Sequence, residues 1–173
     1  LQKHLKIISK QQLKIGFVPT MGALHDGHLS LLKISKKEND VSLCSIFINP
    51  AQFNNQTDLI KYPVRTEQDI FLLEKNYTDI LFMPSREEMN TLKFHVKGDF
   101  NLDGMDNILE GLHRPGHFQG VCEVVEKLLK IVQPTNLYLG EKDFQQCLVL
   151  KKLVHSLQLN VHIRTCPISR AAS

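Results

Sequence analysis

The chain has 173 residues, of which 42% are hydrophobic and 23% are charged, so it can bury the core of a globular domain and is not expected to be disordered. Its 21 basic and 18 acidic side chains leave a formal charge of +3, too small an excess to indicate nucleic acid as a partner. No run of about 18 apolar residues is present, and no long apolar core follows the first residues, so we expect neither a membrane-spanning helix nor a signal peptide.

Apolar runs and amphipathic segments alternate along the chain. The apolar runs predict strands at Lys14–Val18, Val41–Ile48, Asp79–Met83, Thr135–Leu139 and Asn160–Thr165. The amphipathic segments predict helices from His28 to about Asn39, at Val64–Tyr77, at Val121–Val132 and at about 143–158. Between the third strand and the third helix, residues 85–118 form an irregular stretch. Five strands with intervening helices predict an α/β fold with a parallel sheet covered on both faces. Ligands of such sheets bind at the carboxyl ends of the strands, so the loops after Val18, Ile48 and Leu139 are the candidate sites.

The four cysteines, Cys44, Cys122, Cys147 and Cys166, contain no C-x-x-C pair, so a zinc site made of thiolates is not expected. Cys44 falls in an apolar run, and Cys122 and Cys147 fall in helical patterns, where buried free thiols are common. We therefore expect all four thiols to be reduced and the protein to be cytoplasmic.

The loop after the first strand, Pro19–His28, reads PTMGALHDGH and ends in an H-x-G-H pattern where a helix is predicted to begin. Gly22 and Gly27 let the backbone approach a ligand closely, and the N-terminus of a helix favours an anion. His25 and His28 can donate hydrogen bonds to phosphate oxygens there. Alone, this pattern also fits a glycine turn with two surface histidines, but strand, loop and helix in this order form the setting of a nucleotide site.

The loops after the second and fourth strands carry amides and charges. Gln52 can donate and accept hydrogen bonds, which suits a hydroxy acid or an amine, although its segment alone favours a plain turn with one exposed amide. In Gly140–Gln146, Lys142 is a mobile cation suited to phosphate, and Asp143 can hold ribose hydroxyls or cap the following helix. Asp143 and Gln146 fit a capping box, and a cap does not exclude a ligand.

A zinc site is the alternative for the histidines. His25 and His28, with His113 and His117, have the spacings H-x-x-H and H-x-x-x-H, which resemble the spacing of zinc ligands. The first pair lies in a glycine loop, and the chain has no H-E-x-x-H pattern. We therefore favour phosphate binding and expect no metal ion ligated by protein side chains.

Four segments together resemble the pantoate–β-alanine ligase (pantothenate synthetase) family in order and spacing. The resemblance covers nearly the whole chain, from about residue 14 to Arg170, and is carried by Pro19–His28, Ser45–Phe53, Leu109–Gly111 with Arg114–Phe118, and Gly140–Gln146. It implies a Rossmann-like doubly wound parallel sheet of the nucleotidylyltransferase superfamily, of the H-x-G-H type that class I aminoacyl-tRNA synthetases share.

The resemblance implies an activity in coenzyme A biosynthesis, the condensation of (R)-pantoate with β-alanine, with Mg²⁺ entering as the ATP complex. Pantoate attacks the α-phosphorus to give pantoyl adenylate and pyrophosphate, and the amine of β-alanine then displaces AMP. Members of the family are cytoplasmic and usually homodimeric, so small-molecule substrates and a second copy of the chain are the expected partners.

The resemblance also implies roles by position. His28 is implied as the proton donor, with His25 and Lys142 as further catalytic residues at the phosphates. Pantoate binding is implied for Gln52 and Gln146, and β-alanine binding for Gln52. The residues implied to bind ATP are Met21, Gly22, Ala23, Leu24, His25, Asp26, Gly27, His28, Gly140, Glu141, Lys142, Asp143 and Ser169.

Family members continue past the position of Arg170 into a smaller C-terminal domain. The resemblance therefore implies that residues 1–173 are the N-terminal ATP- and pantoate-binding domain, without that second domain. Two alternatives are another H-x-G-H nucleotidylyltransferase, which joins ATP to a phosphorylated metabolite, and a non-catalytic ATP-binding fragment. Gln52 and Gln146 favour the ligase over the first alternative.

Overall fold

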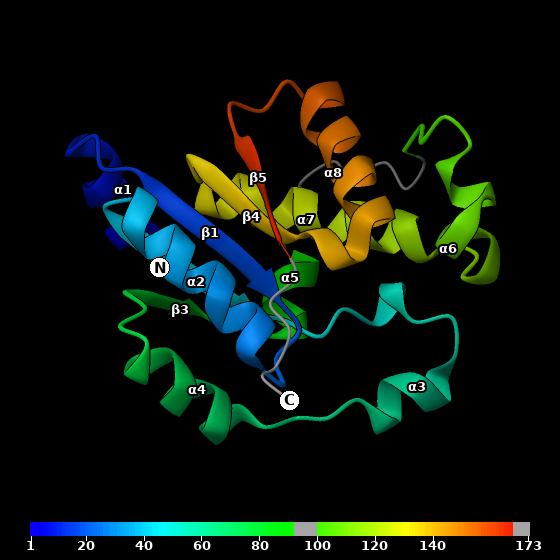
Figure 1. Ribbon diagram of the computed structural model, residues 1–173, viewed down its shortest axis with the longest axis horizontal. Coiled ribbons are helices and arrows are strands. Elements are labelled where there is room, and N and C mark those ends of the chain that lie inside the picture. The colour runs from blue at the N-terminus through cyan, green and yellow to red at the C-terminus, as the bar shows by residue number, and fades with distance from the viewer. Residues whose placement is uncertain (92–99, 168–173) are drawn as a thin grey trace.

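The computed structural model describes residues 1–91 and 100–167, and within them a five-stranded parallel sheet forms the centre of the molecule (Figure 1). The strands are β1 (Ile15–Thr20), β2 (Val41–Ile46), β3 (Ile80–Phe82), β4 (Asn136–Gly140) and β5 (His162–Cys166). Their order across the sheet is β3-β2-β1-β4-β5, and every neighbouring pair is parallel. The order reverses between β1 and β4, which confirms the α/β fold with a doubly wound parallel sheet.

The helices predicted from amphipathic spacing are present with shifted ends: α2 (Asp26–Glu38), α4 (Thr66–Lys75), α7 (His117–Val132) and α8 (Phe144–Ser156). The predicted elements do not include α1 (Gln2–Lys10), α3 (Gln56–Lys61), α5 (Arg86–Thr91), α6 (Leu109–His113) or the short 3-10 helices η1 (Pro50–Gln52), η2 (Met105–Asn107) and η3 (Glu141–Asp143). The prediction that α4 extends to Tyr77 is wrong. Tyr77 has a left-handed backbone (φ 54°) and its side chain is 77% exposed.

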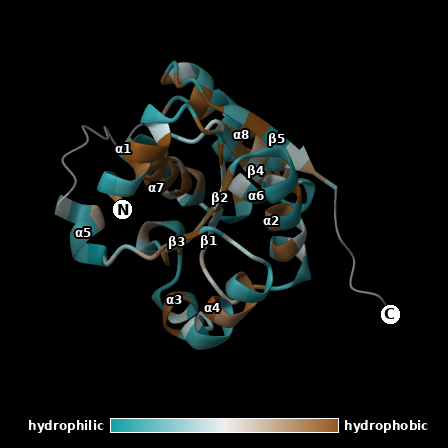
Figure 2. Cartoon of the chain, turned by 90° about the vertical axis from the view of Figure 1, so that its left-hand side faces the viewer, coloured by the Kyte–Doolittle hydropathy of each residue, from teal (hydrophilic) through white to brown (hydrophobic). Residues whose placement is uncertain are grey.

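Successive side chains of a strand point to opposite faces of the sheet, so the sheet separates two apolar cores. On one face Phe17 and Leu43 pack with α1, α7 and α8, and on the other Val18 and Cys44 pack with α2 and α4. Figure 2 shows α1 and α7 on one side of the sheet and α2 on the other. Burying a side chain of this size stabilises the fold by roughly 1.5–3 kcal/mol.

The carboxyl ends of β1, β2 and β4 lie at one edge of the sheet. β1 and β2 run in register to the pair formed by Thr20 and Ile46, and β4 lies on the other side of β1 and ends at Gly140. The loops that carry the H-x-G-H pattern, Gln52 and Lys142 therefore start from the same edge, as the predicted topology requires.

All four cysteines are buried free thiols, as predicted. Burial raises the pKa of Cys44 and of Cys122 to about 12, so neither side chain is a thiolate near neutral pH. None of the helices in the described ranges is long and apolar enough to cross a membrane.

Candidate active site

His25 and His28 lie side by side at the N-terminus of α2. The helix begins at Asp26, and His25 caps it through Nδ1, which accepts a hydrogen bond from the peptide N–H of Gly27 at 3.1 Å. The rings of His25 and His28 stack with their centroids 4.1 Å apart. The first turn of a helix leaves peptide N–H groups without intrahelical partners, so the histidine pair lies beside donors suited to an anion.

His28 is a neutral hydrogen-bonding group in this state rather than a cation. Burial and the neighbouring His25 lower the pKa of His28 from 6.5 to about 4, while the charge of Asp69 acts in the opposite direction. Nδ1 of His28 is buried, and no partner for it exists among the residues that the structure describes. An arriving phosphate would raise the pKa of His28 again, because a nearby negative charge favours the imidazolium.

A cavity of about 180 Å³ joins the three loops at the carboxyl edge of the sheet. Met21 and His28 reach it from the loop after β1, Gln52 from the loop after β2, and Asp143 and Gln146 from the segment after β4. The rest of its lining comes from the polar residues Thr20 and Tyr62 and from the apolar residues Pro19, Phe47, Val121, Val124, Val125, Leu128, Leu139 and Leu150. The structure thus brings both predicted glutamines and one predicted histidine to a single small cavity with both polar and apolar lining.

The backbone around Gln52 is fixed against the beginning of α7. Asn49 Nδ2 donates a hydrogen bond to the carbonyl oxygen of Gly120 at 3.0 Å. A Cβ at Gly120 would lie 2.3 Å from the carbonyl oxygen of Ala51, so only glycine permits this approach. The turn that presents Gln52 to the cavity is therefore held in place before any ligand binds.

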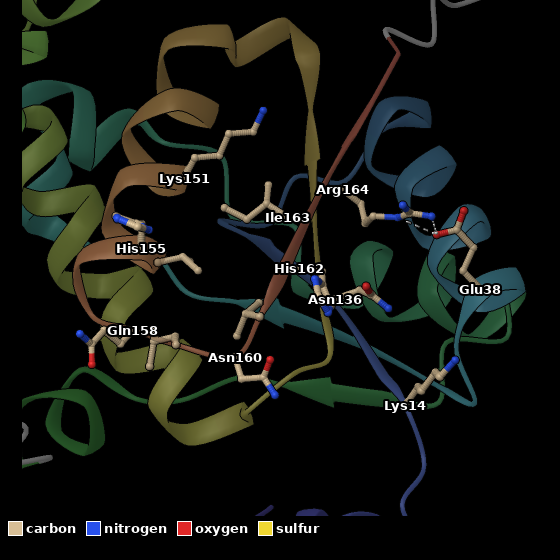
Figure 3. Close-up of a pocket in the computed structure, with 13 residues that line it drawn as sticks. Lys14, Glu38, Asn136, Lys151, His155, Gln158, Asn160, His162, Ile163 and Arg164 are labelled. Carbon is tan, nitrogen blue, oxygen red and sulfur yellow. Dashed lines mark hydrogen bonds and ion pairs between the residues drawn. The ribbon is translucent and has the colours of Figure 1, made fainter.

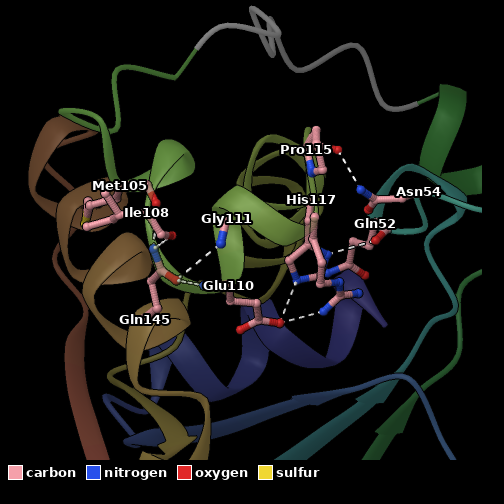
Figure 4. A network of polar contacts seen from close by, with 10 residues as sticks. Gln52, Asn54, Met105, Ile108, Glu110, Gly111, Pro115, His117 and Gln145 are labelled. Carbon is pink, nitrogen blue, oxygen red and sulfur yellow. Dashed lines mark hydrogen bonds and ion pairs between the residues drawn. The ribbon is translucent and has the colours of Figure 1, made fainter.

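His117 supports the same turn and is not placed as a zinc ligand (Figure 4). Its Nδ1 lies 2.8 Å from the carbonyl oxygen of Gln52, so Nδ1 carries the proton and donates. Burial lowers the pKa of His117, and the carboxylate of Glu110 lies 3.9 Å from Nε2 while it also binds Arg114 at 2.6 Å. In the described part of the chain no group of three or more His, Cys, Asp or Glu side chains could hold a metal ion.

The beginning of α8 is not held by the predicted capping box. Asp143 is the N-cap residue, but its side chain caps no peptide N–H, and the residue lines the cavity. Gln145 fixes this end of the helix: Nε2 donates to the carbonyl oxygen of Ile108 at 2.9 Å, and Oε1 accepts from the peptide N–H of Glu110 at 2.9 Å (Figure 4). Because Gln145 is tied to α6, the adjacent Gln146 is left to line the cavity.

A larger hollow of about 1100 Å³ contains none of the predicted site residues (Figure 3). It lies beside the amino ends of β4 and β5, where Lys14, Asn136 and His162 line it, and one wall is the ion pair of Arg164 with Glu38 at 3.2 Å. Ligands of doubly wound sheets bind at the opposite edge, so we place the candidate site in the smaller cavity.

The sequence did not predict that Gln145, His117 and Asp69 support the site. His117 was considered only as a possible zinc ligand. Asp69 is on α4, and its carboxylate accepts hydrogen bonds from the peptide N–H groups of Ala23 and Leu24. None of these contacts belongs to a short motif, so only co-variation with the contacting segments could have indicated them. Ser169, implied to bind ATP, lies outside the described residues.

His28→Gln is expected to weaken the acid dependence of protein stability. Between pH 6.5 and about pH 4 the unfolded chain binds a proton at His28 that the folded protein does not. The contribution of His28 to the free energy of unfolding is therefore complete above pH 6.5 and is lost as the pH falls toward 4. Chemical denaturation at several pH values measures the slope, which should become shallower in His28→Gln. His155→Gln, at an exposed position of α8, is the control, and an unchanged slope in His28→Gln would contradict a neutral His28.

Comparison with known proteins gives one consistent result for the sequence. A family model described as pantoate-beta-alanine ligase matches residues 1–173. The pantothenate synthetase of Francisella tularensis subsp. novicida is 51% identical over 167 residues, which cover 94% of this chain and 62% of that protein. The pantothenate synthetase of Cytophaga hutchinsonii is 48% identical over 173 residues, which cover 100% of this chain and 60% of that protein. The chain thus spans about 60% of the length of these curated relatives.

Solved structures agree with the sequence comparison. A pantoate-beta-alanine ligase from Francisella tularensis, complexed with beta-gamma ATP and beta-alanine, superposes with a TM-score of 0.87 at 48% identity, over 98% of this chain and 66% of that chain. A pantothenate synthetase from Thermus thermophilus superposes with a TM-score of 0.86 at 42% identity, over 91% of this chain and 57% of that chain.

Proposed function

Because the chain belongs to the pantoate–β-alanine ligase family, we propose that it serves the ATP-dependent condensation of (R)-pantoate with β-alanine through pantoyl adenylate. One observation carries the proposal: a single cavity at the carboxyl edge of the sheet is lined by His28, Gln52 and Gln146. The Francisella tularensis relative that is complexed with beta-gamma ATP and beta-alanine supports ATP and β-alanine as substrates.

The lining of the cavity suits a branched hydroxy acid. The amides of Gln52 and Gln146 can bind the carboxylate and hydroxyl groups of pantoate without adding a charge. The apolar side chains of Val121, Leu128 and Leu150 can cover its methyl groups. We assign pantoate to both glutamines, and the β-alanine that later attacks to Gln52.

In the first step a carboxylate oxygen of pantoate attacks the α-phosphorus of ATP, and the bond from that phosphorus to pyrophosphate breaks. Charge grows on the phosphate oxygens, and hydrogen bonds from His25, His28 and Lys142 stabilise it. Once the phosphates have raised its pKa, His28 acts as the proton donor to an oxygen of the leaving pyrophosphate. In the second step the amine of β-alanine attacks the acyl carbon, AMP leaves with the electrons of the C–O bond, and the amine releases a proton.

ATP would lie across the loop Met21–His28 and the segment Gly140–Asp143, with Ser169 at the adenine. Lys142 is exposed beside the N-terminus of α8, where a flexible cation can reach the phosphates. Mg²⁺ enters as part of the substrate complex, bound to those phosphates, and no resident metal ion is part of the proposal.

Exchange of labelled pyrophosphate into ATP tests the proposed function. The first step is reversible, so exchange that requires (R)-pantoate is the expected result. Exchange that requires a phosphorylated metabolite instead would identify another nucleotidylyltransferase. Binding of ATP without exchange under any acceptor would identify a non-catalytic ATP-binding fragment and overturn the proposal.

ATP with Mg²⁺ is expected to stabilise the protein against unfolding. A ligand that binds only the folded state at 100 times its dissociation constant adds about 2.7 kcal/mol to the free energy of unfolding. Thermal denaturation at millimolar ATP with Mg²⁺ measures the shift, with GTP as the control for base selectivity. The absence of any shift with ATP would contradict a nucleotide site in this chain.

A homodimer in the cytoplasm completes the proposal, with residues 1–173 acting as the ATP- and pantoate-binding domain. Exposed apolar side chains gather around α6 and at the beginning of α8, and these support self-association. The side chains are those of Ile108, Leu109, Leu112, Phe144 and Leu148. Buried free thiols are typical of a reducing compartment. Sedimentation of the chain at micromolar concentration tests the dimer, and a monomer would contradict it.

A further inference from the structure

Asp69 is a buried carboxylate whose two oxygens both bind the loop that carries the H-x-G-H pattern. The residue is 2% exposed and lies on α4, next to the apolar core that includes Leu24 and Leu73. Oδ2 accepts a hydrogen bond from the peptide N–H of Ala23 at 2.9 Å, and Oδ1 accepts one from the peptide N–H of Leu24 at 2.8 Å. Within the described residues no basic side chain forms an ion pair with Asp69. Its charge is therefore compensated mainly by the loop itself.

The loop needs such support because its backbone is unusual at two successive residues. Gly22 has a φ of 86° and Ala23 a φ of 49°, and a left-handed conformation is unfavourable for alanine. A Cβ at Gly22 would lie 3.0 Å from Oδ2 of Asp69 and 3.2 Å from the side chain of Ile46, so the carboxylate is packed directly against the turn. The turn ends at His25, which caps α2 and stacks on His28.

We propose that Asp69 is the positioning residue of the nucleotide loop: by binding the peptide N–H groups of Ala23 and Leu24, it fixes the turn that sets His25 and His28 at the start of α2. The inference rests on the proposed function, because the loop is assigned to ATP. It also limits which groups of the loop can bind the phosphates of ATP. Two peptide N–H groups are occupied by Asp69, so the phosphates are left to the two histidines, Lys142 and the first turn of the helix.

Asp69→Asn tests this role because it removes one of the two acceptors and the negative charge. Asparagine keeps the size of the side chain, but one oxygen is replaced by an NH₂ group that faces a peptide N–H, so one hydrogen bond is lost. We expect the affinity for ATP with Mg²⁺, measured by calorimetry, to fall about tenfold, the scale of one hydrogen bond to a charged group. The amide hydrogens of Ala23 and Leu24 should exchange faster with solvent than those of the other loop residues.

Asp79→Asn is the matched control at the other end of the sheet. Asp79 also accepts a hydrogen bond from a peptide N–H, that of Ser42 at 2.8 Å, and it pairs with Lys36 at 2.6 Å. This variant is expected to lose stability and to keep the ATP affinity of the wild type within twofold. A role of Asp69 in stability alone would make Asp69→Asn behave in the same way, and that result would overturn the inference.

Gly22→Ala perturbs the same contact from the loop side, and it is the second test variant if Asp69→Asn does not fold. Its Cβ displaces the carboxylate and strains the backbone, so ATP affinity should fall here as well. A folded Gly22→Ala with wild-type affinity would overturn the inference. Failure of the wild type to bind ATP would instead contradict the proposed function. Wild-type binding that persists unchanged in Asp69→Asn would contradict only the role of Asp69.

Discussion

His28→Ala is expected to slow the formation of pantoyl adenylate by about 10²–10³-fold, the scale for the loss of one preorganised donor at a developing negative charge. His28 lines the cavity, and its imidazole is kept neutral by burial, so the charge of the phosphates can raise its pKa as the reaction proceeds. Binding of ATP should weaken much less, because the peptide N–H groups at the start of α2 remain in place. Single-turnover formation of the adenylate at saturating ATP measures the effect.

The matched control for this substitution is His155→Ala, because His155 is exposed on α8 and lies outside the cavity. It should form the adenylate at the rate of the wild type, and circular dichroism should show both variants folded. A folded His28→Ala with the wild-type rate would show that His28 is only part of the helix start, and the catalytic assignment would be wrong.

Gln52→Ala is expected to raise the KM for pantoate by about 10- to 100-fold, since a hydrogen bond to a charged group contributes roughly 1.5–3 kcal/mol. ATP affinity should stay within twofold, because Gln52 follows β2 and the residues assigned to ATP follow β1 and β4. Steady-state kinetics with pantoate as the varied substrate measures the change. The backbone of the turn is held by Asn49 and His117, so the truncated side chain leaves its shape intact.

Gln2→Ala provides the comparison for Gln52→Ala, since Gln2 is an exposed amide on α1. Its KM values should equal those of the wild type. An unchanged KM for pantoate in Gln52→Ala, or an equal loss of ATP affinity, would remove Gln52 from the pantoate site.

Sequence patterns predicted the sheet and the principal helices because both follow from the periodic burial of apolar side chains. The run Val41–Ile46 is buried on both faces, and α7 buries one continuous stripe against the sheet. The short helices escaped prediction for the same reason. α3 has no buried residue and α6 has only Gly111, so no apolar period marks them.

Some residues of the candidate site could likewise be predicted from local motifs, whereas others depend on contacts between segments that are distant in the sequence. His28, Gln52 and Gln146 lie in or just after the loops at the carboxyl ends of β1, β2 and β4, where the topology alone indicates a ligand, and they do reach one cavity. Asp69 could not be predicted, because its partner Ala23 is 46 positions away and an aspartate in an amphipathic helix is usually a solvated residue. The capping box at Asp143 failed because the backbone there (φ −95°, ψ 58°) is not the extended conformation that such a cap requires.

The transfer of oxygen from pantoate to AMP tests the central claim, formation of an acyl adenylate, most directly. The protein is incubated with ATP, Mg²⁺, β-alanine and (R)-pantoate that carries ¹⁸O in its carboxylate. The masses of AMP and pyrophosphate are then measured by mass spectrometry. Attack of the carboxylate on the α-phosphorus, followed by displacement of AMP by the amine, leaves one labelled oxygen in AMP and none in pyrophosphate. Unlabelled AMP, or label in pyrophosphate or phosphate, would contradict the adenylate mechanism.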